Sequence, residues 1–310
     1  MTTTVKKHHF ASADGTTDIK VKAWWPKLAP KATVIIAHGI GEHVGRYDEV
    51  AIKLNQKGIA VYAMDFIGHG GSINEDKAPM YFGEAGWDYL VEDLITLNKF
   101  VKQVHPETPC FLFGYSLGSF AFRTALAEYP DEIEADGAIF VGTGKISGIV
   151  AALVTRMVGD EADRIGGEDL VSDMVNDLAF GNYNKHFKPT RTQFDWLCKD
   201  EVALDDYIND PMAAKFITPG MFMDLLDGMA RTSKRSSIRN TKNIPILFIS
   251  GKEDPVGNFT KGVKKVANMF KKYNSDVTTR FYPNARHAVM HEKCKDDVIS
   301  FLNFWINKHI

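Results

Sequence analysis

The sequence predicts an α/β fold, a mostly parallel central β-sheet with an N-terminal antiparallel hairpin and a helical cap inserted late in the chain. Two observations carry this prediction. From residue 32 onward, short apolar runs that suit buried strands alternate with longer stretches that have apolar residues at helical spacing, which is typical of a parallel sheet. Between residues 145 and 239 this alternation stops and only helical patterns remain.

The N-terminal segment holds two strand-like runs, residues 5–10 and 19–25, separated by the turn residues Asp14 and Gly15. They predict an antiparallel hairpin. The alternation that follows predicts, in chain order, a strand at 33–39, a helix at 47–57, a strand at 59–65, a helix at 87–104, a strand at 110–113, a helix at 117–129 and a strand at 135–142.

The sheet pattern resumes after the insertion, which is rich in methionine and aromatic residues. The expected elements are a strand at 244–250, a helix at 260–273, a strand at 277–283 and a final amphipathic helix at 294–306. Residues 1–144 and 240–310 are therefore expected to form one core domain, and residues 145–239 a helical cap or lid inserted into it.

The most informative motif is Gly114-Tyr115-Ser116-Leu117-Gly118, which follows an apolar run and precedes a helical pattern. This GxSxG arrangement predicts a sharp strand-to-helix turn that strains the serine backbone and requires glycine on either side. Such a turn exposes the serine hydroxyl above the sheet edge and directs the first amides of the helix toward the same point. We therefore interpret Ser116 as a nucleophile.

A serine hydroxyl needs a neighbouring base, and that base needs a third group to orient it. In a parallel sheet these groups meet at the carboxyl ends of the strands. Asp254 and His287 each follow a predicted strand, so the chain order Ser116, Asp254, His287 predicts a catalytic triad. Two rivals remain open, since Glu253 precedes Asp254 and His291 lies four residues beyond His287.

The loop after the strand at 33–39 contains closely spaced glycines, which permit close backbone approach. With the amide of Leu117, the amide of Ile40 is expected to form an oxyanion hole. His38, Gly39 and Tyr115 are expected to contact substrate. The alternative interpretation of this loop is a flexible connection between a strand and a helix.

A second glycine-rich segment, residues 65–72, lacks the lysine and hydroxyl spacing of a phosphate-binding loop, so we interpret it as a structural turn.

The composition of the chain also excludes some functions. The 37 Lys and Arg residues nearly balance the 39 Asp and Glu residues, which argues against nucleic-acid binding. The three cysteines lack metal-site or disulfide spacing, and there is no apolar leader or run long enough to span a membrane. These features predict a cytoplasmic protein.

Several segments together resemble the α/β-hydrolase superfamily, and within it the monoacylglycerol lipase and lysophospholipase group (serine aminopeptidase S33, hydrolase 4). The segments are residues 37–47, 65–72, 113–119, 250–257 and 286–292, and the pattern HGxGEHxGRY in the first is the most specific. The resemblance covers nearly the whole chain. It implies the same triad and the same two oxyanion donors. The chain departs from the common pattern at Tyr115, where histidine is usual, and at Ser119, where glycine is frequent.

These observations predict a serine carboxylic-ester hydrolase that acts through an acyl-enzyme on monoacylglycerol, lysophospholipid or related acyl esters, with no metal or organic cofactor. The apolar cap suggests room for an acyl chain and transient contact with a membrane surface. One alternative is a peptidase or amidase of the prolyl or serine aminopeptidase type on the same triad. Another is a non-catalytic relative, which the complete triad disfavours.

Overall fold

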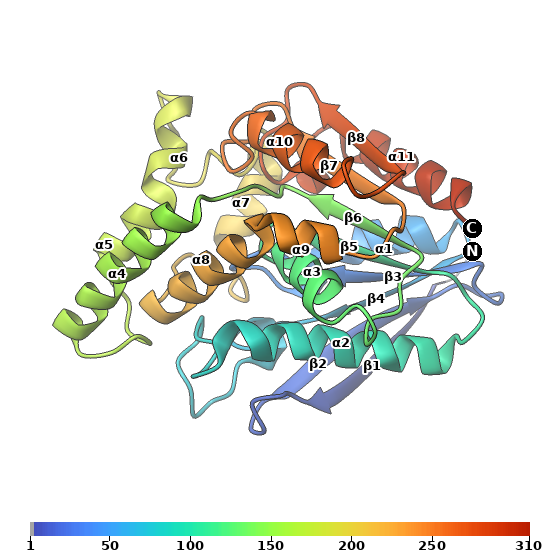
Figure 1. Ribbon diagram of the computed structural model, residues 1–310, viewed down its shortest axis with the longest axis horizontal. Coiled ribbons are helices and arrows are strands. Elements are labelled where there is room, and N and C mark those ends of the chain that lie inside the picture. Colours follow the sequence, from blue (N-terminus) through green and yellow to red (C-terminus); the bar gives the residue numbers. More distant parts are fainter. Residues whose placement is uncertain (1–2) are drawn as a thin grey trace.

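The computed structural model of the chain describes residues 3–310, and at its centre is one eight-stranded β-sheet (Figure 1). The strands are β1 (Thr4–Ala11), β2 (Asp18–Trp25), β3 (Ala32–Ala37), β4 (Ile59–Met64), β5 (Cys110–Tyr115), β6 (Gly137–Val141), β7 (Ile246–Gly251) and β8 (Val277–Tyr282). Their order across the sheet is β1-β2-β4-β3-β5-β6-β7-β8. The pairs β1–β2 and β2–β4 are antiparallel, and all other pairs are parallel.

The burial of the strands explains their sequences. β3, β4 and β5 are buried at every position, as expected for central strands that are covered on both faces. β1 lies at the sheet edge and is largely exposed, with lysines and histidines that suit an unpaired edge. The predicted hairpin is confirmed, with Phe10 opposite Ile19, and Gly15 in its turn has a φ of 72°.

Five helices cover the two faces of the sheet and give the fold three layers (Figure 1). They are α1 (Asp48–Asn55), α2 (Gly86–Val104), α3 (Leu117–Glu128), α10 (Lys261–Phe270) and α11 (Lys295–Lys308). Apolar residues of α2, α3 and α10 form one core cluster, and those of α1 and α11 form the other. Alternate residues of β5 point into each cluster: Leu112 joins the first, and Phe111 and Phe113 join the second. The predicted α/β-hydrolase fold is confirmed.

The inserted segment between β6 and β7 is mainly helical and extends beyond one end of the sheet (Figure 1). Its helices are α4 (Gly148–Ile165), α5 (Asp173–Asn176), α6 (Asn182–Asn184), α7 (Glu201–Asn209), α8 (Pro219–Ser233) and α9 (Arg235–Asn240). α4 packs on α8, α8 also packs on α2 and α3, and α9 lies against α3 and α10. The segment thus rejoins the core through α8 and α9, and the domain boundaries at 145 and 239 stay a prediction.

Short helical turns complete the described chain: η1 (Val44–Tyr47), η2 (Gly70–Ser72), the π-helical turn η3 (Asp177–Gly181), η4 (Lys185–Phe187) and η5 (Val289–His291). Within residues 3–310, no helix is both long enough and apolar enough to cross a membrane.

Candidate active site

Ser116 occupies the sharp turn between β5 and α3 that the sequence predicts. Its backbone has φ 47° and ψ −113°, a conformation that side chains seldom adopt, and its N–H donates to the Val141 carbonyl at 2.9 Å. Glycine is required on both sides. A Cβ at Gly114 would lie 2.5 Å from the Gly118 carbonyl oxygen, and one at Gly118 would lie 2.2 Å from the Ala37 carbonyl oxygen. The close packing of β3, β5 and α3 therefore forces the turn.

The loops after β7 and β8 bring Asp254 and His287 to this turn. The Nε2 atom of His287 lies 2.9 Å from the Ser116 hydroxyl oxygen, and its Nδ1 atom lies 3.0 Å from Asp254 Oδ1. Because a carboxylate accepts, Nδ1 carries the proton and Nε2 is free to accept from the serine. Asp254 is fully buried and also accepts from the Val256 N–H at 2.9 Å. The arrangement can transfer a proton from the serine to the imidazole.

The imidazole of His287 is held between two aromatic rings. The Tyr115 ring centroid lies 5.1 Å from it and the Trp196 ring centroid 5.4 Å. Gly142 closes a third side, since a Cβ there would be 2.9 Å from His287 Cε1. The ring is 2% exposed, so its orientation is fixed by packing as well as by Asp254.

The two rivals from the sequence lie apart from this hydrogen-bonded chain. Glu253 is partly exposed and pairs with Lys199 at 3.0 Å. His291 lies on the other side of the cavity, with its Nε2 atom 4.0 Å from Glu42 Oε1. Burial lowers the pKa of His291 to about 4, and the nearby charge of Arg46 acts in the same direction. The geometry favours Asp254 and His287.

The amides of Ile40 and Leu117 flank the serine from two different loops. Among the hydrogen bonds within residues 3–310, neither N–H has an acceptor. Their neighbours are occupied, because the Gly39 N–H donates to Glu42 Oε2 at 3.2 Å and the Gly118 N–H donates to the His38 carbonyl at 3.1 Å. The two unused donors are available to an oxyanion.

His38 lies beneath the glycine-containing loop and braces it. Its Nδ1–H donates to the Gly39 carbonyl at 2.7 Å, and its Nε2 accepts from the Phe66 N–H at 3.0 Å. Burial lowers the pKa of His38 to about 4, which suits a neutral ring with one donor and one acceptor. Of the three expected substrate contacts, only Tyr115 lines the cavity at the serine, whereas His38 and Gly39 support the loop behind it.

Two chambers meet at the serine. One is lined mainly by apolar side chains. Its polar side chains are Ser116, His287, the hydroxyl of Tyr183 and the indole N–H of Trp196. Its apolar wall comes mainly from the inserted segment and α3, including Phe120, Ile146, Val154, Leu178, Phe180, Ile217, Phe222, Leu225, Leu226 and Met229.

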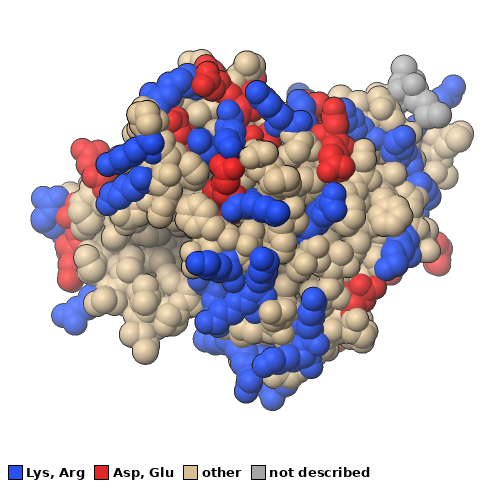
Figure 2. Space-filling model, turned by 90° about the horizontal axis from the view of Figure 1, so that it is seen from above, with Lys and Arg blue, Asp and Glu red and all other residues tan. Residues whose placement is uncertain are grey.

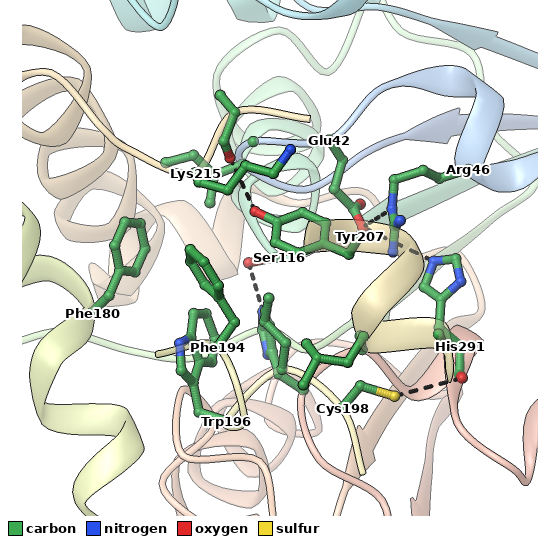
Figure 3. Close-up of a pocket in the computed structure, with 18 of the residues that line it drawn as sticks. Glu42, Arg46, Ser116, Phe180, Phe194, Trp196, Cys198, Tyr207, Lys215 and His291 are labelled. Atoms are coloured by element: carbon green, nitrogen blue, oxygen red, sulfur yellow. Dashed lines mark hydrogen bonds and ion pairs between the residues drawn. The ribbon is translucent and has the colours of Figure 1, made fainter. Parts of the chain in front are cut away.

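The other chamber carries polar groups on the wall opposite Phe180 and Trp196. Figure 3 shows Phe180 and Trp196 on one side of Ser116 and Glu42, Arg46 and His291 on the other. The site therefore has an apolar and a polar direction from the same nucleophile.

Glu42 is the centre of the polar wall. It accepts from the Arg46 guanidinium at 3.1 Å and from the Tyr47 hydroxyl at 2.9 Å, as well as from the Gly39 amide. Burial alone would raise its pKa, but these partners, Arg46 above all, lower the pKa of Glu42 to about 2. Arg46 in turn lies over the Tyr207 ring, 5.0 Å from its centroid. The carboxylate is ionised and satisfied, which fixes the loop on which Ile40 lies.

Sequence reasoning did not single out Glu42, Arg46, Trp196 or Tyr207. The only local signal was the spacing of Glu42 and Arg46, four residues apart within the HGxGEHxGRY pattern. Trp196 and Tyr207 lie in the inserted segment, where sequence reasoning gave no single residue a role.

Comparison with known proteins gives concordant matches. A model of the family described as serine aminopeptidase, S33 (Hydrolase_4) matches residues 29–294. The monoacylglycerol lipase of Mycolicibacterium smegmatis is 27% identical over 316 residues, covering 100% of both chains. The monoglyceride lipase homolog of Monkeypox virus is 40% identical over 291 residues, covering 93% of this chain and 94% of the viral one. Among solved structures, a thermostable carboxyl esterase from Bacillus coagulans has a TM-score of 0.91 at 26% identity, covering 99% of each chain.

Proposed function

The chain belongs to the serine aminopeptidase S33 (Hydrolase_4) family and is a hydrolase of the serine esterase type, and we propose that it hydrolyses monoacylglycerols through an acyl-enzyme. One observation supports this most. The hydrogen-bonded chain from Ser116 through His287 to Asp254 lies where an apolar chamber and a polar chamber meet. An ester with an acyl chain on one side and glycerol on the other fits this division.

In the proposed mechanism, the Ser116 hydroxyl oxygen attacks the ester carbonyl carbon while His287 Nε2 takes its proton. The negative charge that develops on the carbonyl oxygen is stabilised by the N–H groups of Ile40 and Leu117. The carbon–oxygen bond to glycerol then breaks, and the imidazolium returns the proton to the glycerol oxygen. A water molecule, deprotonated by His287, attacks the acyl-enzyme, and the fatty acid leaves with the serine restored.

The apolar chamber supports a long acyl chain as the acid part of the substrate. Its walls are mainly apolar and offer hydrophobic contact along the chain. A peptide substrate with a charged N-terminus would need a free carboxylate instead. The carboxylate in the wall of the polar chamber, Glu42, is already occupied by Arg46, Tyr47 and Gly39. Ester hydrolysis is therefore favoured over peptidase activity.

Contact with a lipid surface is a further part of this proposal. Ile149 and Leu153 on α4 are 83% and 61% exposed, while Ile146 and Val154 beside them line the apolar chamber. Figure 2 shows a hollow surrounded by uncharged side chains toward the end that carries the insertion, with lysine and arginine side chains next to it.

The three cysteines, none of them in a disulfide within residues 3–310, support a reducing, cytoplasmic location.

The decisive experiment replaces the nucleophile. Ser116→Ala should lower kcat/KM on monoolein by on the order of 10⁴ or more, because the whole constellation acts through that oxygen. The matched control is Ser275→Ala, a serine remote from both chambers, which should retain activity. Turnover of monoolein by Ser116→Ala at the wild-type rate would refute the proposal. Faster cleavage of a proline anilide than of monoolein by the wild-type protein would favour the peptidase.

A further inference from the structure

Two loops distant in sequence run side by side next to His287. The cap loop, residues 195–199, belongs to the inserted segment, and the histidine loop, residues 286–292, follows β8. The Ala288 N–H donates to the Leu197 carbonyl at 2.7 Å. This contact places the cap loop where the indole of Trp196 packs against the imidazole of His287.

The side chain of Arg286 strengthens the seam, the line along which the cap loop contacts the histidine loop. Its guanidinium donates to the main-chain carbonyls of Asp195 and Cys198, both in the cap loop. It also lies over the ring of Phe187, 4.1 Å from the centroid. Main-chain and side-chain bonds of the histidine loop thus reach into the inserted segment at several points.

One buried carboxylate oxygen joins the two loops. Glu292 is 1% exposed, and its Oε1 atom accepts from the N–H of Lys199 at 2.9 Å and from the N–H of Arg286 at 2.8 Å. The first donor lies in the cap loop, and the second directly precedes His287. Within residues 3–310, no lysine, arginine or histidine nitrogen lies within 4.0 Å of this carboxylate. The Oε1 atom is therefore held by two main-chain N–H groups and not by an ion pair.

Such a carboxylate is costly to bury, but without it the N–H groups of Lys199 and Arg286 would lose their acceptor. The geometry supplies a reason for it. One oxygen that accepts from both loops fixes their separation, and that separation sets how closely Trp196 covers His287. Burial raises the pKa of the neighbouring Cys198 thiol well above its usual range, and the charge of Glu292 adds to this effect.

We propose that Glu292 is a positioning residue for the base, which couples the inserted segment to the orientation of His287 toward Ser116. The inference rests on the proposed function, because it assigns His287 as the base. It makes the cap loop part of the apparatus that holds the imidazole, in addition to its place in the chamber wall. Misplacing a reacting group by about 1 Å costs on the order of 100-fold in rate.

The test compares Glu292→Gln with Glu292→Met. Glutamine keeps a carbonyl oxygen that can accept both N–H groups, whereas methionine has a similar length and only a weakly accepting sulfur. On p-nitrophenyl butyrate, Glu292→Gln should stay within about threefold of wild-type kcat, and Glu292→Met should lose about 10- to 100-fold in kcat with little change in KM.

Amide hydrogen exchange gives a readout that does not depend on activity. The amides of Lys199 and Arg286 should exchange faster in Glu292→Met and at the wild-type rate in Glu292→Gln. Arg286→Met, which opens the same seam from its other side, provides a second variant if Glu292→Met does not fold. The kcat losses of Arg286→Met and Glu292→Met should combine to less than their product, since both loosen the contact of the cap loop with the histidine loop.

Three results would overturn the inference. Equal kcat losses in Glu292→Gln and Glu292→Met would assign the effect to charge and not to the shared hydrogen bonds. A lower Tm with unchanged kcat in Glu292→Met would assign Glu292 to stability alone. Unchanged exchange at residues 199 and 286 would show that the carboxylate does not hold the loops. An inactive wild-type protein would count against the proposed function only, and the exchange data would still decide the role of Glu292.

Discussion

At the scale of single residues, Asp254 and Glu253 are adjacent in the chain, but only one of them contacts the base. The Asp254 carboxylate is completely buried and its Oδ1 accepts from His287 Nδ1, while Glu253 points outward to Lys199. The Phe259 N–H donates to the Asp254 carbonyl, and the Val256 N–H donates to its side chain. The turn after β7 thus directs the second carboxylate inward.

Asp254→Asn should reduce kcat on monoolein by on the order of 10⁴, because an amide in place of the carboxylate can donate to Nδ1 and favour the imidazole tautomer that cannot accept from Ser116. Glu253→Gln is the matched control. It alters only a surface pair with Lys199, worth about 0–1 kcal/mol, and should leave kcat unchanged. Steady-state kinetics at pH 7 would test both. A larger loss in Glu253→Gln than in Asp254→Asn would exchange the two assignments.

At the scale of elements, α4 has apolar residues on two faces. Val154 lies on the face that helps to close the apolar chamber, and Ala151 and Val158 are buried beside it. The residues Ile149, Val150, Leu153 and Met157 are exposed on the other side. Exposing the outer apolar face of such a helix to water is unfavourable, unless that face meets an apolar partner. We propose that the lipid surface in which monoacylglycerols reside is this partner.

Replacing Ile149 and Leu153 together by serine should weaken binding to phospholipid vesicles by tenfold or more, because each side chain contributes about 1.5–3 kcal/mol when fully buried in lipid. Activity on monoolein dispersed in vesicles should fall accordingly. Activity on soluble p-nitrophenyl butyrate should not change, since neither residue lines a chamber. An equal loss on both substrates would assign these residues to folding or catalysis instead of to the lipid surface.

At the scale of the whole molecule, local signals explain why much of the fold and of the triad could be predicted. The strands, the elbow at Ser116 and the loops after β7 and β8 are each encoded within about ten residues. The seam between the two loops could not be predicted in this way. Trp196 meets His287 and Glu292 meets Lys199 across more than ninety residues. Only packing of the inserted segment on the core brings them together.

Another long-range contact fixes the N-terminal hairpin to the body of the protein. Asp93 on α2 is 1% exposed and accepts from the Ser12 hydroxyl at 2.7 Å and from the Ala13 N–H at 2.8 Å, both beside the hairpin turn. Burial raises the pKa of Asp93 from its ordinary 3.8 to about 7. The folded protein therefore binds a proton at this site more tightly than the unfolded chain does.

This difference predicts that the free energy of unfolding falls as the pH rises from about 4 to about 7, by up to about 4 kcal/mol from this group, and levels off above that range. Asp224, whose pKa burial also raises to about 7, contributes in the same window.

Asp93→Asn keeps a neutral acceptor for the Ala13 N–H and has no charge to desolvate. It should therefore flatten the pH dependence of the free energy of unfolding and stabilise the protein at pH 8. Urea unfolding at several values between pH 5 and pH 8 would measure the free energy of unfolding of each variant. Glu92→Gln, at an exposed neighbouring position, is the control. Parallel curves for Asp93→Asn and the wild-type protein would show that this carboxylate is already ionised in the folded state, and the hairpin would then be held by a charged group at neutral pH.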